Sequence, residues 1–170
     1  KTLLGCKEIE LQKQFDNLLH LGIDIIDPYT LTHDPCLIEV VLNALLVAPI
    51  KTVVIRDAAK TLDGYTQFLS KSQSLNCVRI VGPLPASFDA WIEAIKKRRK
   101  FRIKSFEIVK SKVFLKQSKA LSPLFAAGRF KTLTFTNSLA TEGLYRLYAE
   151  IGSSKHFKCL VELNLEGSRG

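Results

Sequence analysis

The most informative absence from this sequence of 170 residues is methionine, which does not occur at all. Because translation begins at methionine, Lys1 is not a natural start, and we expect the chain to be part of a longer protein or repeat array. Long apolar runs are also missing. The longest stretch with few charges, residues 36–50, contains Glu39 and is too short for a membrane span. No leader-like pattern opens the chain, so the sequence predicts a soluble single domain over residues 1–170.

Cysteine and histidine are too few and too scattered to predict a disulfide framework or a metal site. The four cysteines lie at positions 6, 36, 77 and 159, without paired spacing. The segment from His33 to Cys36 indicates the start of a helix, with Asp34 as N-cap, Pro35 in the first turn and Cys36 turned toward the core. We therefore expect no bound metal and buried, reduced thiols, which are typical of a protein of the cytoplasm or nucleus.

Recognisable catalytic motifs are absent as well. The sequence has no nucleophile elbow, no H-E-x-x-H and no glycine-rich phosphate loop. Asp24, Asp27 and Asp57 follow predicted strands, where α/β enzymes carry catalytic residues, but in a repeat protein such residues mostly form turns. The sequence thus predicts a protein that is not an enzyme and binds no cofactor.

The sequence does contain a repeated pattern, apolar-x-x-apolar-x-apolar. Its clear copies begin at Ile50, Leu75, Ile103, Phe130 and Leu160, so that consecutive copies are 25 to 30 residues apart. A weaker copy occupies His20, Ile23 and Ile25. A pattern at this period predicts repeated structural units, each too small to bury its apolar side alone.

Helical patterns fill the intervals between these copies. Apolar residues spaced i, i+3, i+4 and i+7 occur at Phe88, Trp91, Ile92 and Ile95, and again at Leu37, Val40, Val41 and Ala44. Pro123 predicts a broken or bent helix between residues 114 and 127. We therefore expect the α/β class, as a solenoid of about six strand–helix units with a parallel sheet on one face and helices on the other. The alternative is a doubly wound sheet, whose strands would be longer and more uniformly apolar.

The strand pattern resembles the leucine-rich repeat signature, and helix-containing units of this length look most like the ribonuclease-inhibitor-like type. The resemblance covers roughly residues 8–168 and is clearest over residues 130–167. The chain is also similar to the repeat arrays of F-box-associated proteins. The family places Asn or Cys three residues after the last strand leucine, whereas this chain has Ala58, Pro83, Ser111, Ser138 and Ser168 there, with Asn137 one place early. We therefore expect irregular turns.

In such an array, side chains between the core positions lie on the open face of the sheet, where solenoids usually bind partners. The predicted partner-binding residues are Lys51, Thr52, Val54, Arg56, Arg79, Lys104, Ser105, Glu107, Lys131, Thr132, Thr134, Thr136, Glu162 and Asn164. The central rows of this surface are expected to be basic and the last row acidic. Its mixture of threonine, valine and charge favours a protein partner over duplex DNA.

A second candidate is the basic segment Lys96–Lys104, part of a chain whose net charge is +9. Lys96, Lys97, Arg98, Arg99 and Lys100 could form a nuclear localisation signal or a phosphate-binding patch. They could equally be the solvated end of a helix, where cations complement the helix dipole.

The resemblance implies a protein–protein interaction module, with a substrate-recruiting role in an F-box ubiquitin-ligase adaptor as its narrower form. Two other hypotheses remain: a nucleic-acid-binding or nuclear protein that uses the basic segment, and an α/β enzyme whose active site the sequence does not reveal.

Overall fold

The computed structural model describes residues 13, 25–31, 33–56, 62–84, 88–97, 103–127, 130–137, 142–153 and 160–167. The strands are β1 (Ile25–Ile26), β2 (Thr52–Arg56), β3 (Cys77–Val81), β4 (Ser105–Val109), β5 (Thr132–Thr136) and β6 (Glu162–Asn164). The helices are α2 (Pro28–Leu31), α3 (Pro35–Ala44), the 3-10 turn η1 (Leu45–Val47), α4 (Leu62–Lys71), α5 (Phe88–Lys96), α6 (Leu115–Ala127) and α7 (Glu142–Ser153). None of these described helices is long and apolar enough to cross a membrane.

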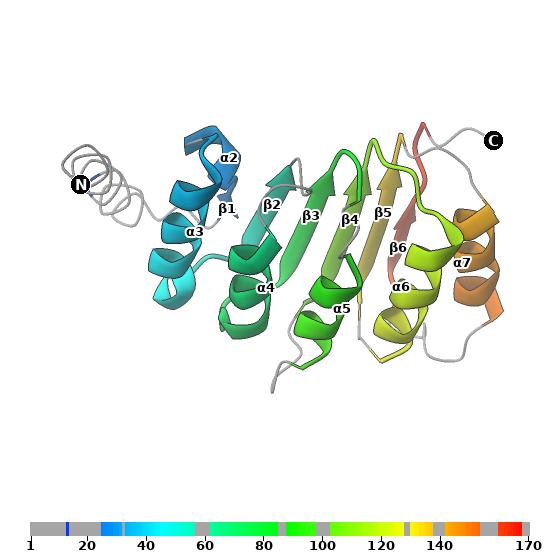
Figure 1. Cartoon of the computed structure of the whole chain (residues 1–170). Coiled ribbons are helices and arrows are strands. Elements are labelled where there is room, and N and C mark those ends of the chain that lie inside the picture. Colours follow the sequence, from blue (N-terminus) through cyan, green and yellow to red (C-terminus); the bar gives the residue numbers. More distant parts are fainter. Residues whose placement is uncertain are drawn as a thin grey trace.

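The six strands form one parallel sheet in the order of the chain, from β1 to β6 (Figure 1). A doubly wound sheet differs, because its strand order reverses at a switch point. The α/β class is therefore confirmed, with a strand order that does not reverse within the described residues.

The register of the sheet follows the repeated sequence pattern. One row of paired residues runs through Val53, Val78, Phe106, Leu133 and Leu163, and a second through Ile55, Ile80, Ile108 and Phe135. All except Leu163, which is on the last strand, are essentially inaccessible to solvent. The second and third apolar positions of the pattern are thus core residues on β2 to β5, as predicted, but the prediction is wrong for the last copy, where Leu163 is 39 % exposed and Leu165 is 37 % exposed.

The weak first copy is aligned wrongly in the sequence prediction. Ile26, and not Ile25, lies beside Val53 in the sheet. Ile26 is 5 % exposed and Ile25 is 55 % exposed. Because side chains alternate between the faces of a strand, a shift of this kind moves the predicted core residue to the opposite face. His20 and Ile23 lie outside the described residues.

The helices lie in one layer against one face of the sheet, and each of α3 to α7 contacts the next (Figure 1). Phe88, Trp91, Ile92 and Ile95 of α5 are buried, as their spacing predicts. Their burial between the helices and the sheet removes a large apolar area from water, which is the main force holding such layers together.

Three helix predictions are wrong in detail. In α3, Val40 is 39 % exposed, and Ile38 and Leu42 are buried instead. Cys36 is exposed, because it lies in the first turn, where its N–H donates to the Asp34 side chain at 3.0 Å. Helix α6 runs through Pro123 without a break, so the predicted break is wrong, whereas the alternative of a bend stays a prediction.

The turn that follows each of the last four strands has the same backbone conformation. Gly82, Lys110, Asn137 and Gly167 all have left-handed φ angles, of 93°, 54°, 51° and 66°. The N–H groups of Gly82, Lys110 and Asn137 each donate to a carbonyl of the neighbouring strand segment, at 2.8 to 2.9 Å. The prediction of irregular turns is therefore wrong for this rim of the sheet. Asn137 occupies the same place as the two glycines.

Lysine at such a position carries a conformational cost that glycine does not. We expect Lys110→Gly to raise the free energy of unfolding by about 1 kcal/mol, because left-handed backbone costs a residue with a Cβ about that much. Lys112→Gly is the matched control: Lys112 is not among the described left-handed residues, and glycine there should lower stability by about 0.5–1 kcal/mol. Urea denaturation measures both. Destabilisation by Lys110→Gly would contradict the prediction.

Candidate functional site

The face of the sheet opposite the helices is the candidate site (Figure 1). Its described members, here called the open face, alternate with the core residues along each strand. They are Thr52, Val54, Arg56, Cys77, Arg79, Val81, Ser105, Glu107, Val109, Thr132, Thr134, Thr136, Glu162 and Asn164. The structure therefore brings together on one surface all the predicted strand residues, which come from five segments of the chain.

At the centre of the open face, one carboxylate collects three donors. The Arg79 guanidinium donates to Glu107 Oε2 at 2.6 Å. The Cys77 thiol and the Ser105 hydroxyl each donate to Glu107 Oε1 at 3.4 Å. Arg79 is 47 % exposed along its side chain, whereas Glu107 is 15 % exposed. The group therefore cross-links β3 and β4 and presents mainly the guanidinium to solvent.

The electrostatics of this group disfavour ionisation of the Cys77 thiol and favour the charged Arg79 guanidinium. Burial raises the pKa of the Cys77 thiol above its ordinary value, and the nearby Glu107 carboxylate raises it further. The hydrogen bond to Glu107 raises the pKa of Arg79. Since the thiolate is the reactive form of cysteine, Cys77 is not activated as a nucleophile.

The central rows are less basic than predicted. Arg79 is paired with Glu107, and Arg56 forms an ion pair with Asp27 at the end of β1. Each arginine is thus neutralised by a carboxylate from an adjacent part of the sheet. Glu162 of β6 is exposed and has no ion-pair partner among the described residues, and the acidic character of the last row stays a prediction.

Accessibility also differs along the open face. Val54 is only 5 % exposed and Cys77 only 9 %, so little of either side chain is available to a partner. Val54 pairs in register with Arg79 of β3. It also lies two residues before Arg56 on β2, and Arg56 forms the ion pair with Asp27. Thr132, Thr134 and Thr136 of β5 are all partly exposed. Apart from the two paired arginines, Arg56 and Arg79, which are each 47 % exposed, the accessible part of the open face therefore lies over β4, β5 and β6.

The predicted lysines lie at the edge where the strands begin. Lys51, Lys104 and Lys131 are exposed. The backbone carbonyl of each lysine accepts two N–H groups from the next strand segment, at 2.8 to 3.1 Å. The carbonyl of Asn76, at the corresponding place before β3, accepts two N–H groups in the same way, at 2.7 and 3.1 Å. These lysines border the open face at its N-terminal rim and are not members of it.

The structure supports the helix-end interpretation for the start of the basic segment. Lys96 pairs with Glu93 one turn earlier, at 2.7 Å, and both lie at the end of α5. Lys97 is exposed, and its N–H donates to the Glu93 carbonyl at 3.0 Å. Arg98, Arg99 and Lys100 lie outside the described residues.

Asp27 has a structural role. Its side chain accepts from the Tyr29 N–H at 3.2 Å, and its carbonyl accepts from the Thr30 N–H at 3.0 Å, as in a turn former. Asp24 and Asp57 lie outside the described residues. In the part of the chain that the structure describes, no three His, Cys, Asp or Glu side chains come close enough together to hold a metal ion.

Sequence reasoning does not single out the residues that follow β4. Lys110, Ser111 and Lys112 line a pocket at the C-terminal rim of the sheet, together with residues of the β3–α5 turn. The sequence does contain a signal for this site. Two lysines flank Ser111 in the segment between a predicted strand and a predicted helix, and the repeated pattern places this segment in a turn. From the sequence, Ser111 stands out only as a departure from the family pattern.

Comparison with protein-family models and with curated proteins gave no match to this chain.

Proposed function

We propose that this chain is a protein-binding module of the leucine-rich-repeat type, a solenoid whose open face contacts the partner in the cytoplasm or nucleus. One observation carries the proposal: six parallel strands in chain order have the described helices on one face, and among the described residues the opposite, largely polar face of the sheet has no element packed on it. Repeat proteins bind along such surfaces, because each unit adds one row of side chains to a common face.

The chemistry of the accessible part points to a protein partner. Hydroxyl groups of Thr132, Thr134 and Thr136 can donate or accept, and Glu162 adds negative charge beside them. Such a mixture suits hydrogen bonding to a partner's backbone and basic side chains. It offers no continuous cationic stripe for nucleic acid.

Site-specific photo-crosslinking tests the proposal. With benzoylphenylalanine at position 134, we expect a covalent adduct with a discrete partner protein in cells, because Thr134 lies at the centre of the accessible face. The same probe in place of Ala90, an exposed residue of α5 in the helical layer, is the matched control and should give no adduct of that mass. Identical adducts from both positions, or adducts from position 90 alone, would refute binding at the open face.

A second variant measures how much this surface contributes to affinity. Thr134→Arg should weaken binding of the cross-linked partner at least tenfold, since it places a bulky cation at the centre of the contact. Ala90→Arg should leave affinity unchanged. The narrower role, substrate recruitment in an F-box ubiquitin-ligase adaptor, rests on the resemblance alone. It predicts that the same partner accumulates when the full-length protein is removed from the cell.

A further inference from the structure

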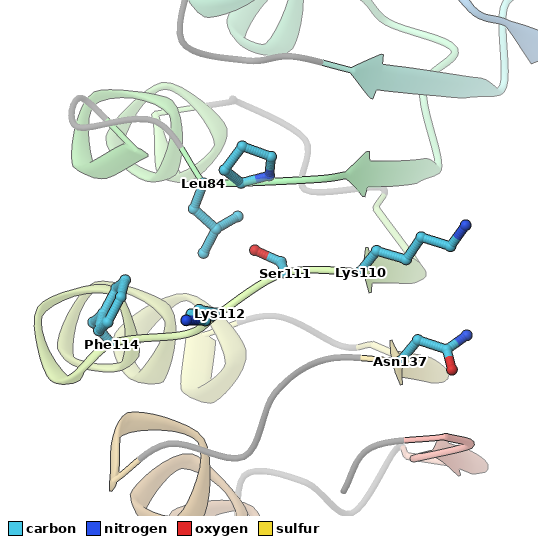
Figure 2. Close-up of a pocket in the computed structure, with 7 residues that line it drawn as sticks. Leu84, Lys110, Ser111, Lys112, Phe114 and Asn137 are labelled. Atoms are coloured by element: carbon cyan, nitrogen blue, oxygen red, sulfur yellow. The ribbon is translucent and has the colours of Figure 1, made fainter.

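A second site lies at the C-terminal rim of the sheet, in the pocket between the turns that follow β3, β4 and β5. Its volume is about 370 Å³, within the range of small-ligand sites. The lining residues are Pro83, Leu84, Lys110, Ser111, Lys112, Phe114 and Asn137. Figure 2 shows Leu84 and Phe114 toward one end of the pocket, Lys110 and Asn137 toward the other, and Ser111 between them.

The Ser111 hydroxyl is the feature that points to a ligand. Ser111 is only 4 % exposed, and its Oγ has no hydrogen-bond partner among the described residues. A buried hydroxyl without a partner is unfavourable, and such groups in native proteins are normally completed by protein, water or a ligand. Figure 2 shows this hydroxyl turned toward the Leu84 side of the pocket.

The charge of the lining favours an anion. Two of the seven residues are lysines and none is acidic. Among the described residues, no carboxylate pairs with Lys110 or Lys112. Two cations on the lining of a pocket that holds a buried hydroxyl create a positive potential, in which a carboxylate gains charge-assisted hydrogen bonds.

The apolar part of the lining favours a ligand with a hydrophobic body. Leu84 is half-buried, Phe114 is 56 % exposed despite its large ring, and Pro83 completes this side. An exposed aromatic residue next to a concave surface is the usual partner of a ligand ring or aliphatic chain.

The backbone supplies an independent indication. Four turn residues on this rim are left-handed, and the two that are not glycine, Lys110 and Asn137, are those that line the pocket. Left-handed backbone is less favourable for lysine than for glycine, so a lysine at this position is consistent with a role for its side chain in the pocket.

We propose that this pocket binds an organic carboxylate with an aromatic or branched aliphatic body, either as a free acid or as part of a peptide. The carboxylate contacts Ser111 and the lysines, and the apolar body packs on Leu84 and Phe114. The proposal does not rest on the open-face function, because its residues belong to the rim turns and not to the open face.

Nuclear magnetic resonance with 3-phenylpropionate tests it. We expect saturable shifts of the Ser111 and Asn137 amide signals, with a dissociation constant of about a few millimolar. The matched neutral probe, 3-phenylpropanamide, should bind about tenfold more weakly, because it lacks the charge. No saturable shift at concentrations well above that constant, or equal binding of acid and amide, would overturn the proposal. So would inorganic phosphate binding as tightly as the acid.

Variants assign the contacts. Ser111→Ala should weaken binding about fivefold to tenfold while the melting temperature stays equal or rises, since the removed hydroxyl has no partner among the described residues. The double change Lys110→Gln and Lys112→Gln should abolish the preference for the acid over the amide. Lys119→Gln, an exposed lysine on α6, is the control and should change neither. A loss of affinity in the control equal to that in the double variant would reject the assignment.

A blocked phenylalanyl-glutamate dipeptide distinguishes the two sources of the ligand. Tighter binding of the dipeptide than of 3-phenylpropionate identifies a partner's peptide segment, and the reverse identifies a free acid. Either order of affinities supports the pocket, because both require saturable binding of 3-phenylpropionate, whose absence rejects the proposal. Photo-crosslinking at position 134 is unaffected by any of these outcomes.

Discussion

Trp91→Ala is expected to lower the free energy of unfolding by about 4 kcal/mol, a much larger loss than a typical single substitution causes. Trp91 is the only tryptophan of the chain and is 1 % exposed. Its ring lies 5.7 Å from that of Tyr65 in α4 and 6.5 Å from that of Phe88 in its own helix. Removing it leaves a cavity at the contact of two helices and ends both ring contacts, which add to the loss of buried area.

Urea denaturation followed by circular dichroism measures this loss, because the variant has no tryptophan fluorescence. Tyr145→Ala is the matched control, since Tyr145 is an aromatic residue on α7 that is 57 % exposed. Its replacement should change stability by less than about 0.5 kcal/mol. A Trp91→Ala loss no larger than that of the control would mean that the contact between α4 and α5 contributes little.

Phe135→Ala should have an effect of similar size, about 3–5 kcal/mol, but in a different part of the molecule. Phe135 is fully buried on β5, and its ring meets that of Tyr148 from α7 edge to face at 5.8 Å. Each strand in this sheet pairs only with its sequence neighbours, so β6 depends on β5 for its only strand contact among the described residues.

Hydrogen exchange locates the damage caused by Phe135→Ala. Amide protons of β5 and β6 should lose protection before those of β2 and β3, since units that contact only their neighbours unfold locally. Phe114→Ala is the control, because Phe114 is 56 % exposed. Equal loss of protection in all strands would show instead that the sheet unfolds as one unit.

Much of the sheet was predictable from the sequence, because its register follows from a repeated pattern. Val53, Val78, Phe106 and Leu133 share both a pattern position and a row of the sheet. The prediction failed at β1, where the described strand has two residues and the pattern is weak. With so short a strand, the choice between Ile25 and Ile26 as core residue depends on packing against β2.

The open face was predictable as a set of residues but not as an electrostatic surface. Alternation along a strand specifies that Arg79 and Glu107 share a face, and repeat alignment makes them neighbours. Whether they form an ion pair depends on side-chain conformation, which no sequence period encodes. The rim pocket was missed for a related reason, because it is built from turns, whose conformations are set by individual residues such as Lys110 and Asn137.

The described helices lie between successive strands of the chain and pack on one face of the sheet, which determines how the two layers curve. Paired strands lie about 4.8 Å apart, whereas packed helices need about 8–10 Å between their axes. The row of helices is accordingly longer than the row of strands (Figure 1), and the protein is a wedge whose narrow side is the open face. If the chain has the proposed protein-binding function, we expect this narrow side to be concave, so that a flat partner would touch only its two ends. We therefore expect the protein to select a convex partner, such as a single helix or a protruding loop, and to reject an extended planar one.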